Sequence, residues 1–364
     1  MILSEAVALT ALREFFHECP FVFIGSGMSC ALDDRFGMPA LREALIASVP
    51  GRTLTAQGKS EWSAVETALS NGFDLESAMD AAKDDGLLSV VTDITAALVG
   101  TADRECGFRI ADGEAEWPAT KLVQKMVDCL PEGDPVLHVL TPNYDLILEY
   151  ACDAAGIPYG NGFLRGVSRG SDWDAVERAM RVPRKVKGPG QTLKIVGLTK
   201  KHVRLYKVHG SLDYFEHQGL VVENAAWTWG PPKSARRVMI TPGSSKYETM
   251  QLHRRELQQT ADGAIDKASR FLFLGYGFND THLHNYVGRK LVEEGCPGVI
   301  LTRDSNDQIE SLLLDAKNLW LVCKCDVSGQ AGTRIFNSRY GGSLEIPGVA
   351  LWDVATFTAE VLGG

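Results

Sequence analysis

A run of four apolar residues that ends in a glycine loop constrains the fold of this chain more than any other feature. The run is Phe21 to Ile24, and Gly25-Ser26-Gly27 follows it directly. Such a run predicts a buried parallel strand, and glycines just after the strand let the backbone approach a phosphate closely. The usual dinucleotide fingerprint needs a third glycine at the position that holds Cys30 here. The sequence therefore predicts a strand and loop that bind a dinucleotide in another way.

Further apolar runs alternate with segments of helical periodicity after residue 136. The expected strands are 137–140, 202–208, 238–241, 271–275, 298–302 and 319–323. The expected helices are 145–155, 249–267, 281–293 and 306–317. This alternation predicts an α/β fold with a Rossmann-like, doubly wound parallel sheet.

The same patterns suggest how the chain is divided. We expect a Rossmann domain formed by residues 1–50 and 131–330 and interrupted by a helical module at 51–130, where no β-type alternation occurs. Residues 160–202 are rich in glycine and basic side chains, and we expect a basic insert there. Residues 331–364 form a predicted C-terminal extension that ends in a helix.

Charge is distributed unevenly along the chain, whose net charge is −9. Residues 61–134 contain 16 acidic and 5 basic side chains, whereas residues 165–207 contain 12 basic and 3 acidic ones. Solvated surface is the usual reason for such runs. The alternative is that the two segments meet across subunits of a homo-oligomer, or that the basic segment receives a phosphate or a partner. The sequence leaves open whether it contacts nucleic acid.

The eight cysteines are irregularly spaced, with no C-x-x-C pair. This pattern favours free thiols in a reducing cytoplasm over a disulfide framework. No basic N-terminal segment precedes a long apolar run, and no apolar run reaches eighteen residues, so we expect a cytoplasmic protein without a membrane span.

Polar residues follow three of the expected strands directly. They are Asn143 and Asp145 in Thr141-Pro-Asn-Tyr-Asp, His209 in Val208-His-Gly-Ser, and Asp280 at the end of Gly275-Tyr-Gly-Phe-Asn-Asp. Open α/β proteins bind ligands at this carboxyl edge of the sheet. Asn143 or Asp145 could instead cap the next helix, and a lone histidine in a turn is more often structural. An imidazole can also accept a proton near neutral pH.

Taken in order, these segments resemble the motifs of the sirtuin family. The chain reads G-S-G-M-S at Gly25 to Ser29, G-M-P-A-L-R at Gly37 to Arg42, then T-P-N-Y-D and H-G-S. The resemblance implies a general-base role for His209 and places Asn143 and Asp145 at the nicotinamide pocket. It implies NAD contacts for the early residues Gly25, Ser26, Gly27, Ser29 and Arg42, and for the late residues Gly275, Tyr276, Gly277 and Asp280.

Two departures from the sirtuin deacylases bear on function. Ala40 and Leu41 replace the usual Asp and Phe, and the two C-x-x-C pairs of the structural zinc module are missing. Asp280, His282 and His284 form a compact D-x-H-x-H, but a helix starting near Thr281 would turn the histidines to different faces, so we expect no metal.

The G-Y-G-F-N-D segment resembles bacterial anti-phage sirtuin-like effectors. This implies an NAD glycohydrolase that releases nicotinamide and ADP-ribose and stops phage by depleting NAD, with a HerA-type ATPase as the implied partner. An NAD-dependent protein deacylase is one alternative. A module that senses NAD or ADP-ribose and regulates the partner ATPase is the other.

Overall fold

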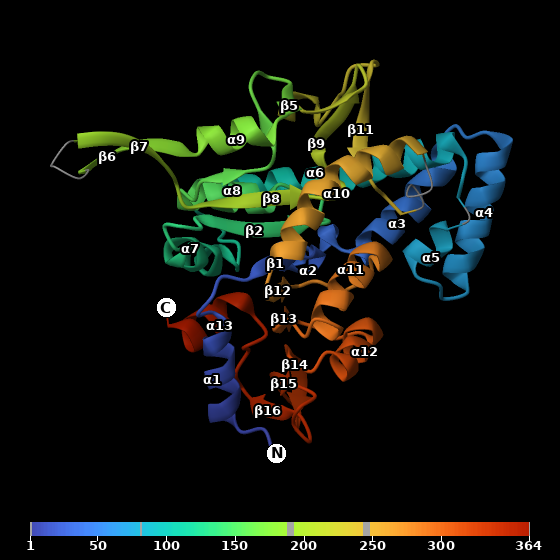
Figure 1. Ribbon diagram of the computed structural model, residues 1–364. Coiled ribbons are helices and arrows are strands. Elements are labelled where there is room, and N and C mark those ends of the chain that lie inside the picture. The colour runs from blue at the N-terminus through green and yellow to red at the C-terminus, as the bar shows by residue number, and fades with distance from the viewer. Residues whose placement is uncertain (1, 81, 188–192, 243–247, 364) are drawn as a thin grey trace.

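The computed structural model describes residues 2–80, 82–187, 193–242 and 248–363. Within these ranges the side chains of 186–187, 193–196, 248–256 and 281–282 lie outside the description. A nine-stranded sheet crosses the middle of the molecule (Figure 1). Its strands, in spatial order, are β16 (Leu344–Pro347), β15 (Gln330–Phe336), β14 (Leu319–Val327), β13 (Gly298–Thr302), β12 (Phe271–Leu274), β1 (Phe21–Ile24), β2 (Val136–Thr141), β8 (His202–Lys207) and β3 (Tyr159–Gly160).

Seven of these strands, from β14 to β3, are parallel, and β15 and β16 continue the sheet in antiparallel fashion. Helices cover both faces of this sheet. In chain order, the helices of the described residues are α1 (Glu5–Phe15), α2 (Ser26–Cys30), α3 (Met38–Ser48), α4 (Ala56–Ser70), α5 (Leu75–Met79), α6 (Asp85–Ala111), α7 (Thr120–Cys129), α8 (Ile147–Ala155), α9 (Trp173–Ala179), α10 (Glu248–Lys267), α11 (Thr281–Val292), α12 (Asp307–Asp315) and α13 (Val354–Leu362). The predicted doubly wound α/β fold is confirmed.

Strand β1 shows how the sequence produces the two layers. Its side chains alternate, so Phe21 and Phe23 pack with α10, α11 and α12, whereas Val22 and Ile24 pack with α1, α6, α7, α8 and α13. All four residues of β1 are buried, because parallel strands of this class are covered on both sides. This explains why the strand reads as a continuous apolar run.

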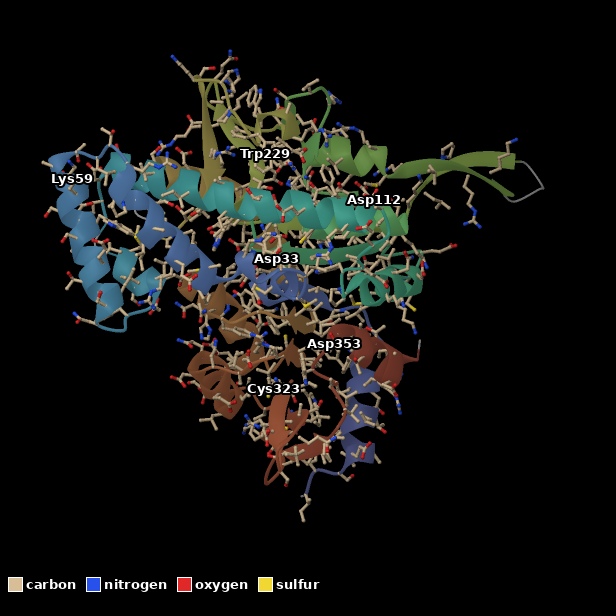
Figure 2. The ribbon with its side chains drawn as sticks, turned by 180° about the vertical axis from the view of Figure 1, so that it is seen from behind. Asp33, Lys59, Asp112, Trp229, Cys323 and Asp353 are labelled. Carbon is tan, nitrogen blue, oxygen red and sulfur yellow. The ribbon has the colours of Figure 1, made fainter. Side chains whose placement is uncertain are left out.

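The helical segment at 51–130 is shared between two cores. Helices α4 and α5 and the first half of α6 form a separate core with α3, around Trp62, Leu69 and Leu87. The second half of α6 joins α7 in the main core against the sheet. Helix α6 has 27 residues and begins next to α4, the helix on which Lys59 is labelled in Figure 2. It ends at its C-cap residue, Asp112 (Figure 2).

Helix α6 is also the one helix among the described residues that is long and apolar enough to cross a membrane. Half of its apolar window is buried inside the protein, and the core helix of a soluble protein meets the same criterion. Length and composition alone are therefore weak evidence for a span.

A second, antiparallel sheet was not expected. Its order is β11 (Ala235–Met239), β9 (Gly210–His217), β10 (Leu220–Glu223), β5 (Arg169–Ser171) and β4 (Phe163–Leu164). The expected strand at 238–241 was assigned to the wrong sheet, since β11 pairs antiparallel with β9. The β9–β10 hairpin turns at Gln218 and Gly219, both with positive φ, and this turn signal was missed. Strands β6 (Arg181–Lys187) and β7 (Leu193–Thr199) pair only with each other and project from the body (Figure 1).

Candidate active site

A pocket of about 160 Å³ opens at the carboxyl ends of β1, β2, β8 and β12, which are neighbours in the sheet. Eight of the twelve residues expected from the sequence line it. Those that follow β1 and β2 are Gly25, Ser26, Asn143 and Asp145. Those that follow β8 and β12 are His209, Tyr276, Gly277 and Asp280. A cavity of about 150 Å³ holds a benzene-sized ring, so the volume suits one aromatic ring.

The glycine loops after β1 and β12 are packed directly against each other. A Cβ on Gly25 would lie 2.3 Å from the carbonyl oxygen of Gly275, and one on Gly27 would lie 2.9 Å from the same atom. The amide of Gly25 donates to Leu274 and that of Gly27 donates to Gly275. The glycines are therefore required by this close approach, and both amides are already hydrogen-bonded within the protein.

Ser29 connects the glycine loop to the loop that follows β2. Its hydroxyl donates to Oδ2 of Asp145 over 2.8 Å and accepts from Nδ2 of Asn143 over 3.1 Å. Ser29 itself does not line the pocket, but it sets the orientation of two residues that do. Burial raises the pKa of Asp145, and Lys207 and the Ser29 hydroxyl oppose that shift.

His209 and Asp280 form a hydrogen-bonded pair in the pocket. Nε2 of His209 lies 2.6 Å from Oδ2 of Asp280, and both side chains are largely buried. In the tautomer that carries the proton on Nε2, this nitrogen donates to the carboxylate and Nδ1 keeps its lone pair. A histidine oriented by a carboxylate is the arrangement that general bases use.

Glycine at position 210 lets His209 occupy this place. Gly210 has φ +80°, and a Cβ there would lie 1.9 Å from the carbonyl oxygen of Val238 on β11. The amide of Ile240 donates to the His209 carbonyl over 2.9 Å. Glycine therefore follows the histidine because β11 packs directly against the backbone at this position.

Tyr276 carries an observation that points to a ligand. Its hydroxyl is buried and has no hydrogen-bond partner among the described residues, and the residue lines the pocket. Burial raises the pKa of Tyr276 above its usual value, with Asp280 and Glu76 contributing. A buried hydroxyl without a partner is rare in native proteins, so it fits a ligand that supplies one.

The structure does not bring Arg42 to the pocket. Its guanidinium donates from Nη2 to the carbonyl of Leu69 on α4 over 2.8 Å, although Gly37, Met38 and Leu41 of the same motif line the pocket. The arginine that does line the pocket is Arg35, which pairs with Asp33 at 2.6 Å and with Glu105 of α6.

Sequence reasoning missed several lining residues. Glu76 comes from α5 of the helical segment, and Arg35 and Phe36 come from the long turn before Gly37. Burial raises the pKa of Glu76, and the nearby Asp280 carboxylate adds to this shift while His209 opposes it. No local motif marks Glu76, because only the packing of α5 brings it to the strand ends. Asn279 was within reach of sequence reasoning, since it directly precedes Asp280.

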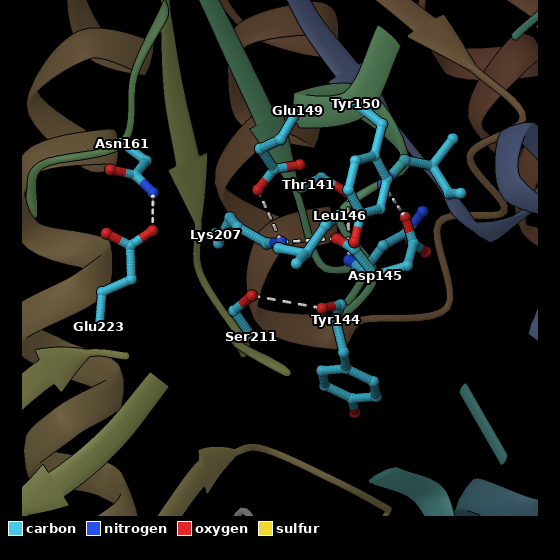
Figure 3. Close-up of polar contacts among 12 residues, drawn as sticks. Thr141, Tyr144, Asp145, Leu146, Glu149, Tyr150, Asn161, Lys207, Ser211 and Glu223 are labelled. Carbon is cyan, nitrogen blue, oxygen red and sulfur yellow. Dashed lines mark hydrogen bonds and ion pairs between the residues drawn. The ribbon is translucent and has the colours of Figure 1, made fainter. Parts of the chain in front are cut away.

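A buried charged network lies behind the pocket (Figure 3). The ammonium of Lys207, on β8, donates to the Asp145 carbonyl over 2.6 Å and to Oε1 of Glu149 on α8 over 2.9 Å. The Lys207 side chain is 0% exposed. Burial alone would lower the pKa of Lys207, but Glu149, Asp213 and Asp145 together raise it. Lys207 therefore stays charged beneath the Asp145 loop.

In the part of the chain that the structure describes, no group of three or more His, Cys, Asp or Glu side chains could hold a metal ion. Helix α11 begins at Thr281 as expected, with Asp280 as its N-cap. The His282 side chain lies outside the described residues, and the D-x-H-x-H pattern is therefore assessed only in part.

Comparison with known protein families identifies the class of protein. A model of the SIR2-like domain matches residues 137–320, just over half of the chain. The chain belongs to the SIR2-like domain family, whose members typically are NAD-dependent enzymes. No curated protein matches the chain. The matched range contains Asn143, Asp145, His209 and Asp280, whereas the glycine loop at 25–29 precedes it.

Proposed function

We propose that this protein is an NAD glycohydrolase, which cleaves NAD to nicotinamide and ADP-ribose. One observation carries the proposal: the His209–Asp280 pair shares a ring-sized pocket with Asn143 and Asp145 at the strand ends. The partnerless hydroxyl of Tyr276 and the family's use of NAD support a coenzyme in the same place.

The residues that line the pocket suit the nicotinamide end of NAD. Gly25, Ser26 and Tyr276 belong to the two glycine loops, and Asn143 and Asp145 belong to the loop that follows β2. NAD supplies a nicotinamide–ribose bond whose cleavage needs no metal, since nicotinamide leaves as a neutral molecule. We assign the nicotinamide end to Asn143 and Asp145 and the remaining part to the glycine loops.

The chain's own groups then account for hydrolysis. Nδ1 of His209 accepts a proton from the attacking water, whose oxygen bonds to the ribose carbon as the carbon–nitrogen bond breaks. Asp280 holds the imidazole in the required tautomer and stabilises its charged form. The amide of Asn143, fixed by Ser29, orients the water or a ribose hydroxyl. A general base of this kind contributes about 10²–10⁴-fold.

The departures from the deacylase pattern support water as the acceptor. Ala40 and Leu41 stand where deacylases carry Asp and Phe, and the zinc cysteines are absent from the sequence. We place the activity in anti-phage defence by NAD depletion, restrained by assembly with itself and with a partner such as a HerA-type ATPase. The acidic and basic segments of the chain support control by assembly.

The test follows nicotinamide release from NAD by the full chain, alone and with the protein encoded next to it. We expect release by the wild type and at least a 10²-fold loss in His209→Ala, with an unchanged thermal midpoint. His217→Ala is the matched control, since this histidine lies on β9 and does not line the pocket. Intact NAD under both conditions refutes the hydrolase. A product formed only with an acetylated peptide assigns a deacylase, and tight NAD binding without release assigns a sensing module.

A further inference from the structure

One peptide bond next to the candidate active site is held at both ends by buried ionisable side chains. The carbonyl of Asp145 accepts from Lys207 Nζ over 2.6 Å, and the amide of Leu146 donates to Oδ1 of Asp103 over 2.6 Å. Lys207 comes from β8, whereas Asp103 comes from α6 of the helical segment. Two distant parts of the chain therefore fix the peptide that carries the Asp145 side chain.

Asp103 adds an acceptor at the start of α8, where the Asp145 side chain already accepts from the Ile147 amide over 3.3 Å. Helix α8 begins at Ile147, and its N-cap residue, Leu146, has no polar side chain. The first amides of a helix have no intrahelical acceptor, and a carboxylate is the favoured partner there. Asp103 supplies it from another helix and also accepts from the Tyr150 hydroxyl over 3.3 Å.

The burial of Asp103 argues against an incidental contact. The residue is 4% exposed, although a buried carboxylate is unfavourable unless it is hydrogen-bonded. Helix α6 also packs closely on α8 at Gly107, where a Cβ would lie 2.6 Å from the Tyr150 ring. One turn of α6 thus contacts α8 through Asp103 and Gly107 together.

We propose that Asp103 and Lys207 are positioning residues that set the orientation of Asp145 and Asn143. They do so by hydrogen-bonding to the amide and the carbonyl of the Asp145–Leu146 peptide. This inference rests on the proposed function of the same pocket. It gives the helical segment a part in the reaction, because α6 is continuous with the core of α4 and α5. Neither residue touches the pocket itself.

The test compares Asp103→Leu, which removes the acceptor, with Asp103→Asn, which keeps an oxygen for the Leu146 amide. Misplacing a reacting group by about 1 Å can lower the rate about 10²-fold. We expect a kcat loss of that order in Asp103→Leu with KM within about 3-fold, and rescue to within about 10-fold in Asp103→Asn. Thr101→Ala, an exposed change two residues away on α6, is the matched control. Wild-type kcat in a folded Asp103→Leu variant overturns the proposal.

A second variant covers the case in which Asp103→Leu does not fold. Lys207→Met combined with Glu149→Leu removes the hydrogen bond at the other end of the peptide and replaces the buried pair with apolar side chains of similar volume. We expect the same loss of kcat with KM retained, and wild-type kcat again contradicts the inference.

A readout without turnover separates this inference from the proposed function. Hydrogen exchange at the Leu146 amide should speed up at least 10-fold in Asp103→Leu and stay near wild type in Thr101→Ala. A crystal structure of Asp103→Leu should show Asp145 displaced from Ser29. If wild type releases no nicotinamide, the hydrolase fails, and unchanged exchange and an undisturbed Asp145 would separately refute the positioning role.

Discussion

Nε2 of His209 lies 2.6 Å from the carboxylate of Asp280, although 71 residues separate them in the sequence. The second oxygen of Asp280 accepts from the amide of Leu283 over 2.8 Å and caps α11. The backbone of α11 thus fixes the carboxylate, and the carboxylate fixes the imidazole. Asp280 therefore has two candidate roles: contact with the coenzyme, which the sequence predicted, and orientation of His209.

Asp280→Asn should separate capping from catalysis. Asparagine caps a helix as well as aspartate does, so the thermal midpoint should hardly change. The loss of the carboxylate leaves His209 without the group that fixes its tautomer, and kcat for nicotinamide release should fall about 10²–10⁴-fold. Asp353→Asn is the matched control, because Asp353 caps α13 in the same way. Equal kcat in the two variants would remove Asp280 from the mechanism.

Gly25→Ala should destabilise the protein strongly. The added Cβ would meet the Gly275 carbonyl oxygen at 2.3 Å, and backbone cannot move aside cheaply. We expect a loss of about 1–3 kcal/mol in the free energy of unfolding, measured by urea denaturation. Gly263→Ala is the control, since Gly263 lies within α10 with open space around it and should gain about 0.5–1 kcal/mol. A Gly25→Ala variant as stable as wild type would contradict this packing.

Asp103 should make stability fall as pH rises. Burial raises the pKa of Asp103 to about 7, with the Asp145 charge adding to the shift, from an ordinary value of 3.8. Between these values the folded state holds a proton that the unfolded state has lost, so the unfolding free energy decreases with pH across pH 4–7. Carboxylates whose pKa is lowered in the folded state change stability with pH in the opposite direction. The contribution of Asp103 is therefore isolated by the difference in stability between wild type and a variant that lacks this carboxylate.

Urea denaturation of wild type and Asp103→Asn from pH 5 to 8 provides that difference. The variant should gain stability relative to wild type as pH rises, and the gain should level off above pH 7. The titratable groups that face Asp103 are Asp145, Glu149, Lys207 and the Tyr150 hydroxyl. Thr101→Ala should show no such trend, because the Thr101 hydroxyl donates to the Ala97 carbonyl instead. A constant difference between wild type and Asp103→Asn would show that Asp103 does not titrate in this range.

Arg42→Ala should have little effect on activity. The side chain is exposed and donates to a carbonyl of α4, so we expect at most about 1 kcal/mol of lost stability and a kcat/KM within about 3-fold of wild type. Arg35→Ala is the informative comparison, since Arg35 lines the pocket and its loss should raise KM. A large loss in Arg42→Ala alone would restore the role implied by the sirtuin resemblance.

Much of the sheet and of the pocket could be predicted because their signals are local. Short apolar runs followed by Gly25, Asn143 or His209 mark strand ends, and parallel strands place those ends at one edge. The predicted bounds of α8, α10 and α11 were close because helical periodicity is also a local signal. Arg42 was assigned by motif alone, and motif position does not say which way a long side chain turns.

The remaining features depend on packing between distant segments. Nothing near Asp103 in the sequence shows that it caps α8, because its partner amide is 43 residues away. Glu76 reaches the pocket only through the placement of α5. The antiparallel sheet was missed since its hairpin turns at Gln218-Gly219, a pair less typical of such turns than Asn-Gly.

The central place of β1 limits what can be cut from this protein. The strand lies between β12 and β2, yet it precedes the family-matched range by more than a hundred residues. A fragment restricted to that range would open a gap in the middle of its own sheet and leave two bare strand edges, which invite aggregation. The smallest working unit must therefore begin ahead of residue 21.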